Sequence, residues 1–315
     1  MQSHKSNPAV PLVLLGLGVI WGSAFIFMKV LVDEISPAQI VAARLALGAL
    51  VVVGVTAFRG RLGVLTPGII VPGALLVVVD NVIPNTLVAW SETRIDSGMA
   101  SVLMSSMPLF TTIFAMILLR EGASGIRVAG LVIGFCGVMI VSDGDVLSLQ
   151  SNNGIGMLAV VAASSSHAAG AIYTKKLLAR FDALGLTAMK LTTGAAITAP
   201  FVLITRGAGA YTAMSFEAVV CLLLLGVLAT GVAYAVYIWV VGAAGVVQAS
   251  MVTYIVPVAG LLLAWAILGE PMGVSTIAGG AVIVAGVATV MFGPLVRIPG
   301  LPLRAPTAEQ QEASA

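Results

Sequence analysis

The stretch MPLFTTIFAMILLREG, residues 107–122, places a proline at the front of an apolar run of helix length and closes the run with an Arg-Glu pair. The stretch VPVAGLLLAWAILGEP, residues 256–271, has the same layout, with its proline and glutamate at the same spacing. The two stretches therefore indicate an internal repeat, and the offset from Pro108 to Pro257 sets its length.

The same offset aligns further residues of the two halves without gaps. Trp90 then meets Trp239, and Glu121 meets Glu270. Coincidences of Leu, Ala, Gly and Val mean little in so apolar a chain, whereas coincidences of Trp, Pro and Glu are informative. The repeat therefore extends well beyond the two stretches that reveal it.

The composition assigns the chain to the lipid bilayer. It is 59% hydrophobic and 9% charged, with a mean hydropathy of +1.11, far from the values of soluble domains. The apolar runs have the length that a helix needs to cross about 30 Å of hydrocarbon, and they lack the alternation of a barrel strand. The first run continues to Val32, too far for a signal peptide. We predict an all-α integral membrane protein.

The apolar runs predict ten transmembrane helices, at 10–32, 37–58, 67–91, 97–119, 126–143, 154–176, 184–205, 215–240, 245–268 and 273–294. Each half of the chain, residues 1–144 and 145–296, then holds five helices, and a short polar tail follows at 297–315. Because five is odd, the second half enters the membrane upside down. We therefore expect two inverted five-helix repeats around a central cavity.

The basic residues predict the orientation, because Lys and Arg are retained on the cytoplasmic side. With the amino terminus inside, the outer loops hold only Arg94 and Arg206. Most loop acids fall on the outer side: Asp33, Glu34, Glu92, Asp96, Asp143, Asp145, Glu217 and Glu270. We expect a multi-pass protein of the inner (cytoplasmic) membrane with both termini in the cytoplasm.

Two segments and their repeats resemble a known family. The stretch ASVLMSSMPLFTTIFAMILLREG with the following GLVIGFCGVMIV, and the counterparts ASMVTYIVPVAGLLLAWAILGEP and GGAVIVAGVATV, are similar to the paired EamA-type repeats of the drug/metabolite transporter superfamily. The early WGSAFIFMKVL resembles the first helix of that family, and the likeness covers the chain from about Val10 to Phe292.

This resemblance implies a cavity formed mostly by helices 1–4 and 6–9, with helices 5 and 10 at the periphery. Members of the superfamily include YddG-like amino-acid exporters, drug exporters and carriers of sugar nucleotides or triose phosphates. Family membership alone does not choose among these substrates, so the function has to be argued from the polar residues within the membrane.

The costliest of these residues is Asp80, near the middle of the third helix in VVVDNVIPNT. An acid at that depth costs about 2.5–3.5 kcal/mol on insertion scales. With Asn81 and Asn85 it predicts a wet segment that faces the cavity, where the acid would bind an ammonium group or carry a coupling proton. The alternative is a buried acid held by the nearby amides.

Further candidates for the cavity are one histidine and four aromatic residues. His167 and Trp21 fall on the sixth and first helices, which the resemblance places around the cavity. The rings of Tyr234, Tyr237 and Tyr254 suit an amphipathic substrate that needs apolar walls and a few polar anchors. Packing with satisfied polar groups is the alternative for each of them.

Pro108 and Pro257 remove a backbone hydrogen bond and are expected to bend the fourth and ninth helices. Bent helices in mirrored positions are predicted to gate the path, although such prolines can also serve packing alone. Arg44 and Lys190 lie about two turns inside their helices. They either extend to the lipid headgroups or capture anions at the two mouths.

The remaining signals are structural. Glu121 and Glu270 follow the ends of the fourth and ninth helices and are expected to tie loops or neighbouring helix N-termini. Small-residue faces on the fifth and tenth helices allow close helix contact, within a monomer or in a weak homodimer. These faces consist of Gly130, Gly134, Gly137, Gly279, Gly280 and Gly286.

The inventory argues against an enzyme, since there is no acid pair within the hydrocarbon and no phosphate-binding loop. No cofactor, metal or nucleic-acid partner is expected. Few basic residues are available to meet phosphates in a dry cavity. We therefore predict a secondary transporter that exports amino acids or related small metabolites by alternating access. The alternative is export of drugs or cationic amphiphiles, and a carrier of phosphorylated sugars or nucleotide sugars is less favoured.

Overall fold

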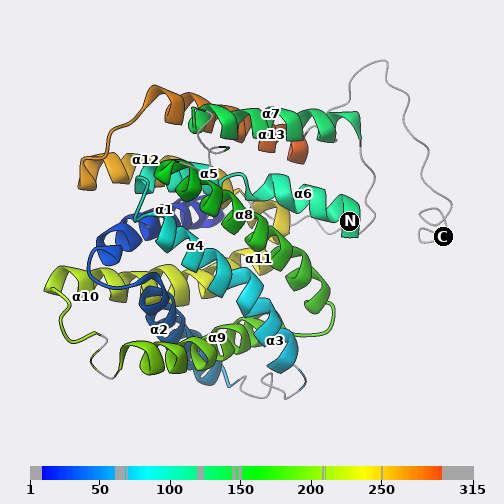
Figure 1. The fold of residues 1–315 in the computed structure, drawn as a ribbon. Coiled ribbons are helices and arrows are strands. Elements are labelled where there is room, and N and C mark those ends of the chain that lie inside the picture. The colour runs from blue at the N-terminus through cyan, green and yellow to red at the C-terminus, as the bar shows by residue number, and fades with distance from the viewer. Residues whose placement is uncertain are drawn as a thin grey trace, which may run out of the picture.

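The computed structural model describes residues 9–60, 68, 70–118, 124–143, 147, 151–207, 209, 211–249 and 251–292. Within these residues the regular secondary structure is helical and contains no strand (Figure 1). The predicted tail at 297–315 and Glu121 lie outside the described part of the chain.

Seven stretches are long and apolar enough to cross a membrane: Ala9–Val32, Pro37–Phe58, Ile70–Ser91, Ser97–Leu118, Asn152–Leu177, Ala183–Arg206 and Phe216–Val241. Three apolar helices are shorter: Gly125–Val141, Val252–Leu268 and Val274–Val290. The prediction of an all-α membrane fold is confirmed. The ten stretches fall on the ten predicted ranges, and ten complete crossings stay a prediction because three of them are short.

Breaks within these stretches divide them into shorter elements, of which Figure 1 labels the α-helices. In chain order they are α1 (Ala9–Val32), α2 (Pro37–Phe58), α3 (Ile70–Val77), η3 (Val78–Val82), α4 (Ile83–Ser91), α5 (Ser97–Met104), α6 (Met107–Leu118), α7 (Gly125–Val141), α8 (Asn152–Leu177), α9 (Ala183–Arg206), α10 (Phe216–Leu223), η5 (Leu224–Val232), α11 (Ala233–Ala249), α12 (Val252–Leu263), η6 (Ala264–Leu268) and α13 (Val274–Phe292).

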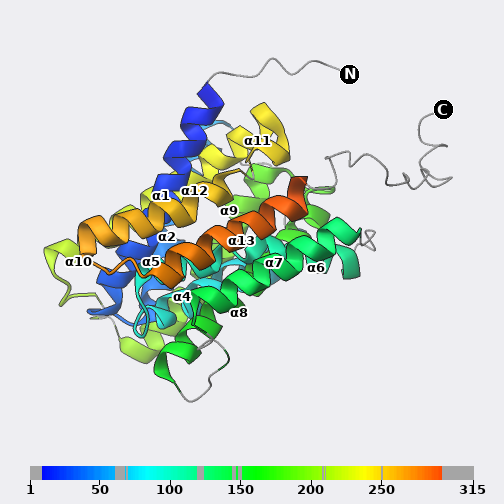
Figure 2. The same ribbon diagram turned by 90° about the horizontal axis from the view of Figure 1, so that it is seen from above.

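The helices form a bundle with two distinct edges. In Figure 1, α7 and α13 lie side by side along the top edge, and α2 and α9 pack together along the bottom edge. The elements α1, α4, α5, α8, α11 and α12 lie between these edges (Figures 1 and 2). The pair α7 and α13 thus occupies the edge position that the family resemblance implies for the fifth and tenth helices.

Glycines bring α7 and α13 into close contact. A Cβ atom on Gly137 would lie 2.6 Å from the backbone nitrogen of Ile283, and one on Gly286 would lie 2.4 Å from that of Gly134. Gly130 and Gly279 are equally close to the facing backbone. These small-residue faces are therefore used for packing within the chain, and a homodimer no longer follows from them.

Segments of π-helix interrupt two of the long stretches. The segments Val78–Val82 and Leu224–Val232 overlap when the repeat offset from Pro108 to Pro257 is applied. Such segments weaken regular helix hydrogen bonding and are common at functional sites. Both halves of the chain therefore carry the same irregularity at the equivalent depth.

The two prolines behave differently. Helix α5 ends at Met104 and α6 begins at Met107, so the fourth stretch is broken just before Pro108. Pro108 has no N–H for the Met104 carbonyl, which instead accepts a 3.3 Å hydrogen bond from Ser164 Oγ of α8. The fourth stretch is thus interrupted just ahead of Pro108, whereas α12 runs through Pro257 without ending there. The bends predicted at the two prolines, and their role in gating, stay predictions.

One end of the bundle holds residues 33–36, 92–96, 211–215 and 269–273, and we call it the acidic end. Here Glu270 accepts hydrogen bonds of 2.9–3.0 Å from the backbone of Ser97 and Gly98 and from the Ser97 hydroxyl. The carboxylate thereby caps the N-terminus of α5, where the helix dipole favours a negative charge. The predicted structural role of Glu270 is borne out by these contacts.

Glu34 ties a second pair of segments together at the acidic end. Its carboxylate accepts hydrogen bonds from the backbone N–H and the hydroxyl of Ser215, which precedes α10. These bonds stabilise the charged form and lower the pKa of Glu34 below its ordinary value. Two glutamates therefore join loops that are distant in sequence.

We expect Gly137→Ala to destabilise the bundle, because the new methyl group would meet the backbone of α13 rather than a flexible side chain. Overpacking of this kind costs about 1–3 kcal/mol. Thermal unfolding in detergent should show a lower Tm. Gly54→Ala is the matched control, since nothing lies within 4 Å of a Cβ at Gly54, and its Tm should be unchanged or higher. Equal stability of both variants would contradict the close packing of α7 and α13.

Candidate functional site

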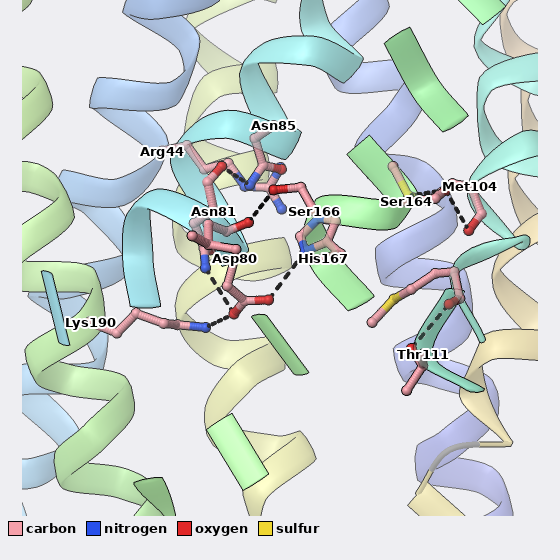
Figure 3. Close-up of polar contacts among 12 residues, drawn as sticks. Arg44, Asp80, Asn81, Asn85, Met104, Thr111, Ser164, Ser166, His167 and Lys190 are labelled. Atoms are coloured by element: carbon pink, nitrogen blue, oxygen red, sulfur yellow. Dashed lines mark hydrogen bonds and ion pairs between the residues drawn. The ribbon is translucent and has the colours of Figure 1, made fainter. Parts of the chain in front are cut away.

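A cluster of polar side chains lies in the interior of the bundle, between α2, η3, α4, α8 and α9 (Figure 3). We call it the central cluster, and it consists of Arg44, Asp80, Asn81, Asn85, His167 and Lys190. Arg44, Asn81, Asn85 and Lys190 are buried, and the side chain of Asp80 is only 14% exposed. The central cluster is therefore largely buried inside the bundle.

Asp80 is the centre of this cluster. Its Oδ2 atom lies 2.6 Å from Lys190 Nζ and accepts a 3.2 Å hydrogen bond from Asn81 Nδ2. Its Oδ1 atom lies 3.3 Å from His167 Nδ1. Asp80 is thus neither a free acid nor an acid held by amides alone, because its main partner is a lysine from α9.

The local backbone explains how Asp80 reaches this position. Asp80 lies within the π segment η3, and a Cβ atom on Gly170 of α8 would lie 2.5 Å from the Asp80 Cβ. Ser166 Oγ donates a 2.6 Å hydrogen bond to the carbonyl of Val79 in the same segment. Gly170 therefore lets the π segment approach α8 closely, and Ser166 binds one of its carbonyl groups.

Arg44 forms the second charged centre of the cluster. Its Nε donates to Thr230 Oγ1 at 2.7 Å, and its Nη1 donates to Asn85 Oδ1 at 2.6 Å. Asn85 Nδ2 donates in turn to the Asn81 carbonyl at 2.7 Å. Both Arg44 and Lys190 point into the bundle, so the interpretation that they extend to the lipid headgroups is wrong.

Three predicted aromatic residues adjoin the central cluster. The ring centroid of Trp21 lies 6.0 Å from that of Tyr234 and 5.4 Å from that of Tyr237. Trp21 Nε1 donates a 3.1 Å hydrogen bond to the Ala229 carbonyl. Lys190 Nζ lies 4.7 Å from the Tyr234 ring centroid, a cation–π contact that joins the aromatic group to the charged one.

The structure thus brings together seven of the eight predicted cavity residues: Trp21, Asp80, Asn81, Asn85, His167, Tyr234 and Tyr237. Tyr254 of α12 is half-buried and packs against the main hydrophobic core instead. Sequence reasoning placed Arg44 and Lys190 at the mouths of the path and missed their link to Asp80. The cost of an isolated acid in the membrane was the signal that a cation had to lie near it.

The charges of the cluster are unbalanced. Asp80 is compensated by Lys190, whereas the hydrogen-bond acceptors of Arg44 are neutral groups of Asn85 and Thr230. Among the described residues, no carboxylate forms an ion pair with Arg44. Arg44, Lys190 and Asp80 together carry one excess positive charge in surroundings of low dielectric constant, where this charge attracts a carboxylate strongly.

We expect Lys190→Met to destabilise the protein, because the substitution leaves Asp80 buried without its ion-pair partner. Breaking a buried pair from one side costs about 3–5 kcal/mol. The double variant Asp80→Asn with Lys190→Met removes both charges and should recover most of the lost Tm. If Lys190→Met alone unfolds at the wild-type temperature, the pair does not contribute as the geometry implies.

Comparison with known proteins identifies the family of the chain. The sequence matches the EamA-like transporter family over residues 9–143 and again over residues 154–292.

Individual relatives cover most of the chain. The uncharacterized transporter YoaV of Bacillus subtilis is 25% identical over 88% of this chain and 95% of its own length, and an uncharacterized transporter of Archaeoglobus fulgidus is 28% identical over 87% and 96%. A probable terminal-alkyne amino-acid exporter of Streptantibioticus cattleyicolor is 26% identical over 85% and 89%. A crystal structure at 18% identity, covering 90% of this chain and 98% of the other, superposes with a TM-score of 0.64 and shares the fold. The chain belongs to the EamA-like transporter family and is a multi-pass membrane transporter.

Proposed function

We propose that this transporter exports amino acids or closely related zwitterionic metabolites by alternating access, and that the substrate binds between Asp80 and the two cations of the central cluster. The observation that carries the proposal is the buried ion pair in which Lys190 Nζ lies 2.6 Å from Asp80 Oδ2. An ion pair in the interior of a membrane protein is costly and marks a functional path.

A zwitterion can replace this pair without leaving a charge uncompensated. Its ammonium group would take the place of Lys190 at Asp80, while its carboxylate would bind Lys190 and the unbalanced Arg44. A simple organic cation would displace Lys190 from Asp80 and leave three positive groups together. A phosphorylated substrate would bring two negative charges beside Asp80. Because a dry site penalises unpaired charge, the zwitterion fits best.

The aromatic residues beside the cluster supply the rest of the binding surface. Trp21, Tyr234 and Tyr237 form one contiguous group, and Tyr234 already contacts Lys190. Small-molecule sites usually combine such apolar walls with a few polar anchors. An amino acid with an apolar side chain would place that side chain against this aromatic group.

One relative supports the same substrate class. The probable terminal-alkyne amino-acid exporter of Streptantibioticus cattleyicolor matches 85% of the present chain, and the name of that relative states an amino-acid cargo. An identity of 26% does not indicate which amino acid is carried. The proposal therefore names the substrate class, amino acids and related zwitterions, and no single compound.

Alternating access is supported by the duplication of the family match. The two matches cover equivalent halves of the chain, and both halves carry a π segment at the equivalent depth. Five helices in each half would place the repeats in inverted orientation, the architecture in which one half rocks against the other around a fixed site. The acidic end would then face the outer side of the cytoplasmic membrane, and both termini would lie in the cytoplasm.

Proteoliposomes test the substrate class directly. We expect uptake of labelled amino acids into vesicles that contain the wild-type protein, with competition by other amino acids and little competition by quaternary amines or phosphorylated sugars. Competition by quaternary amines alone would establish the drug-export alternative. A flux that does not respond to an imposed pH gradient would count against the hypothesis that Asp80 or His167 carries a coupling proton.

The double variant Asp80→Asn with Lys190→Met separates binding from folding. It should fold, because the two changes together leave no newly unpaired buried charge. It should nevertheless lose amino-acid transport, because the ammonium group of a zwitterion loses Asp80 and its carboxylate loses one of its two cations. Asn81→Ala is the matched control from the same segment, and it should lower transport less than the double variant does. Transport at the wild-type rate by the double variant would refute the proposed binding site.

The break at Pro108 generates a further prediction. Pro108→Ala restores an N–H that can bond the Met104 carbonyl and should close the gap between α5 and α6, so we expect a higher Tm together with slower transport. A proline inside a helix costs about 3 kcal/mol, which bounds the gain in stability. Pro72→Ala in the first turn of α3 is the control and should change neither quantity. Unchanged transport in Pro108→Ala would assign the break to packing.

A further inference from the structure

An unpartnered carboxyl group lies buried at the acidic end of the bundle. Glu92 directly follows α4 and is 0% exposed, and neither of its two carboxyl oxygens has a hydrogen-bond partner. An ionised carboxylate in such a place would lose its hydration without gaining a hydrogen bond in exchange, which strongly disfavours the charged form. Glu92 is therefore neutral, with a proton bound, in the arrangement described here.

The nearest cation is already engaged elsewhere. Lys29, in the last turn of α1, donates from Nζ to the backbone carbonyls of Glu92 at 2.7 Å and of Ile95 at 3.0 Å. Among the described residues, Lys29 forms no ion pair with the Glu92 carboxyl group. Lys29 thus uses its donors to hold the loop 92–96 against α1, and it can do so because the neighbouring carboxyl group does not compete.

The same loop is fixed on its other side by Glu270, which caps the start of α5 at Ser97 and Gly98. The loop 92–96 therefore joins α1 on one side to the segment before α13 on the other. We call the bonds from Lys29 to the two carbonyls, together with protonated Glu92, the latch.

The charged groups around Glu92 come from every side of the loop. Lys29 on α1 and Arg44 on α2 favour its ionised form, Glu270 opposes it, and burial opposes it most strongly. Asp96 lies in the same loop and faces Lys29 and Glu270. Helix α8 packs on this loop through Gly156 and carries no ionisable side chain between Asn152 and Val160. Burial thus raises the pKa of Glu92 well above its ordinary value of 4.5.

We propose that Glu92 is a proton-binding site whose protonation locks the acidic end closed. When Glu92 loses its proton, the carboxylate pulls Lys29 from the two carbonyls or draws in water, and either change releases the loop 92–96 from α1. The inference rests on alternating access, as proposed above, but not on which substrate is carried. It assigns to the acidic end a control by protons that is separate from the central cluster.

The direction of the pH effect follows from the two states of Glu92. In the latched state the pKa is raised, and in an open, hydrated state it returns toward 4.5. The proton therefore stabilises the latched state fully below the hydrated pKa, and this stabilisation is lost as the pH rises through the raised pKa. Acid on the outer side should close the acidic end, and alkaline solution should open it.

Spin-label distances measured by electron paramagnetic resonance test the latch in the full-length protein in lipid nanodiscs. The labels replace the exposed residues Asp33 and Thr93, one beside α1 and the other in the loop 92–96, after Cys136→Ser and Cys221→Ala remove the native thiols. We expect a single short distance at low pH, and a second, longer distance whose share grows as the pH rises through the raised pKa of Glu92.

Three variants identify the groups responsible. Glu92→Gln, which imitates the protonated form, should keep the short distance at every pH. Lys29→Gln, which removes the cation of the latch, should show the longer distance at every pH. Asp96→Asn is the matched control in the same loop and should keep the wild-type pH dependence.

A wild-type distance that does not change with pH would overturn the proposal, and so would a Glu92→Gln protein that titrates like the wild type. If Glu92→Gln does not fold, infrared spectra of the wild-type protein with isotopically labelled glutamate still decide, because absence of a protonated glutamic-acid band at neutral pH refutes the latch. A distance that responds to substrate but not to pH would keep alternating access and refute the latch alone.

Discussion

The structure depends on one constraint, that charge inside a membrane protein has to be compensated within the protein. Asp80 on η3 and Lys190 on α9 satisfy this constraint for each other, and no hydrophobic packing could replace either partner singly. The pair links the third and seventh helical stretches across the bundle. The π segment, Gly170 and Ser166 can be understood as the local adjustments that bring the two charges within 2.6 Å.

Three of the irregular parts of the helices carry polar chemistry. Asp80 lies in a π segment, Thr230 lies in the equivalent segment of the second half, and the break before Pro108 exposes a carbonyl to Ser164. Regular helices would satisfy every backbone group internally and leave none for such contacts. These departures from regular helical geometry thus lie at or beside the central cluster.

Much of this could be predicted from the sequence, because hydropathy and residue spacing are local signals. The all-α membrane fold, the positions of the helical stretches and the capping role of Glu270 follow from such signals. The grouping of Trp21 and His167 with Asp80 came from the family resemblance. The ion pair of Asp80 with Lys190 could not be predicted from the sequence, since the two residues lie on different helices and only the packing of these helices brings them together. The burial of Glu92 was missed for the same reason, because an acid in a short loop resembles a solvated one until the neighbouring helices cover it.

Helix α8 has a mechanical consequence for the molecule. Ser164 contacts the break between α5 and α6, while Ser166 and His167, less than one turn further along, contact η3 and Asp80 (Figure 3). A helix rises only about 1.5 Å per residue and resists stretching over so short a distance. One short segment of α8 therefore holds both the π segment at Asp80 and the break before Pro108. We expect any displacement of one of these irregular segments to be transmitted to the other.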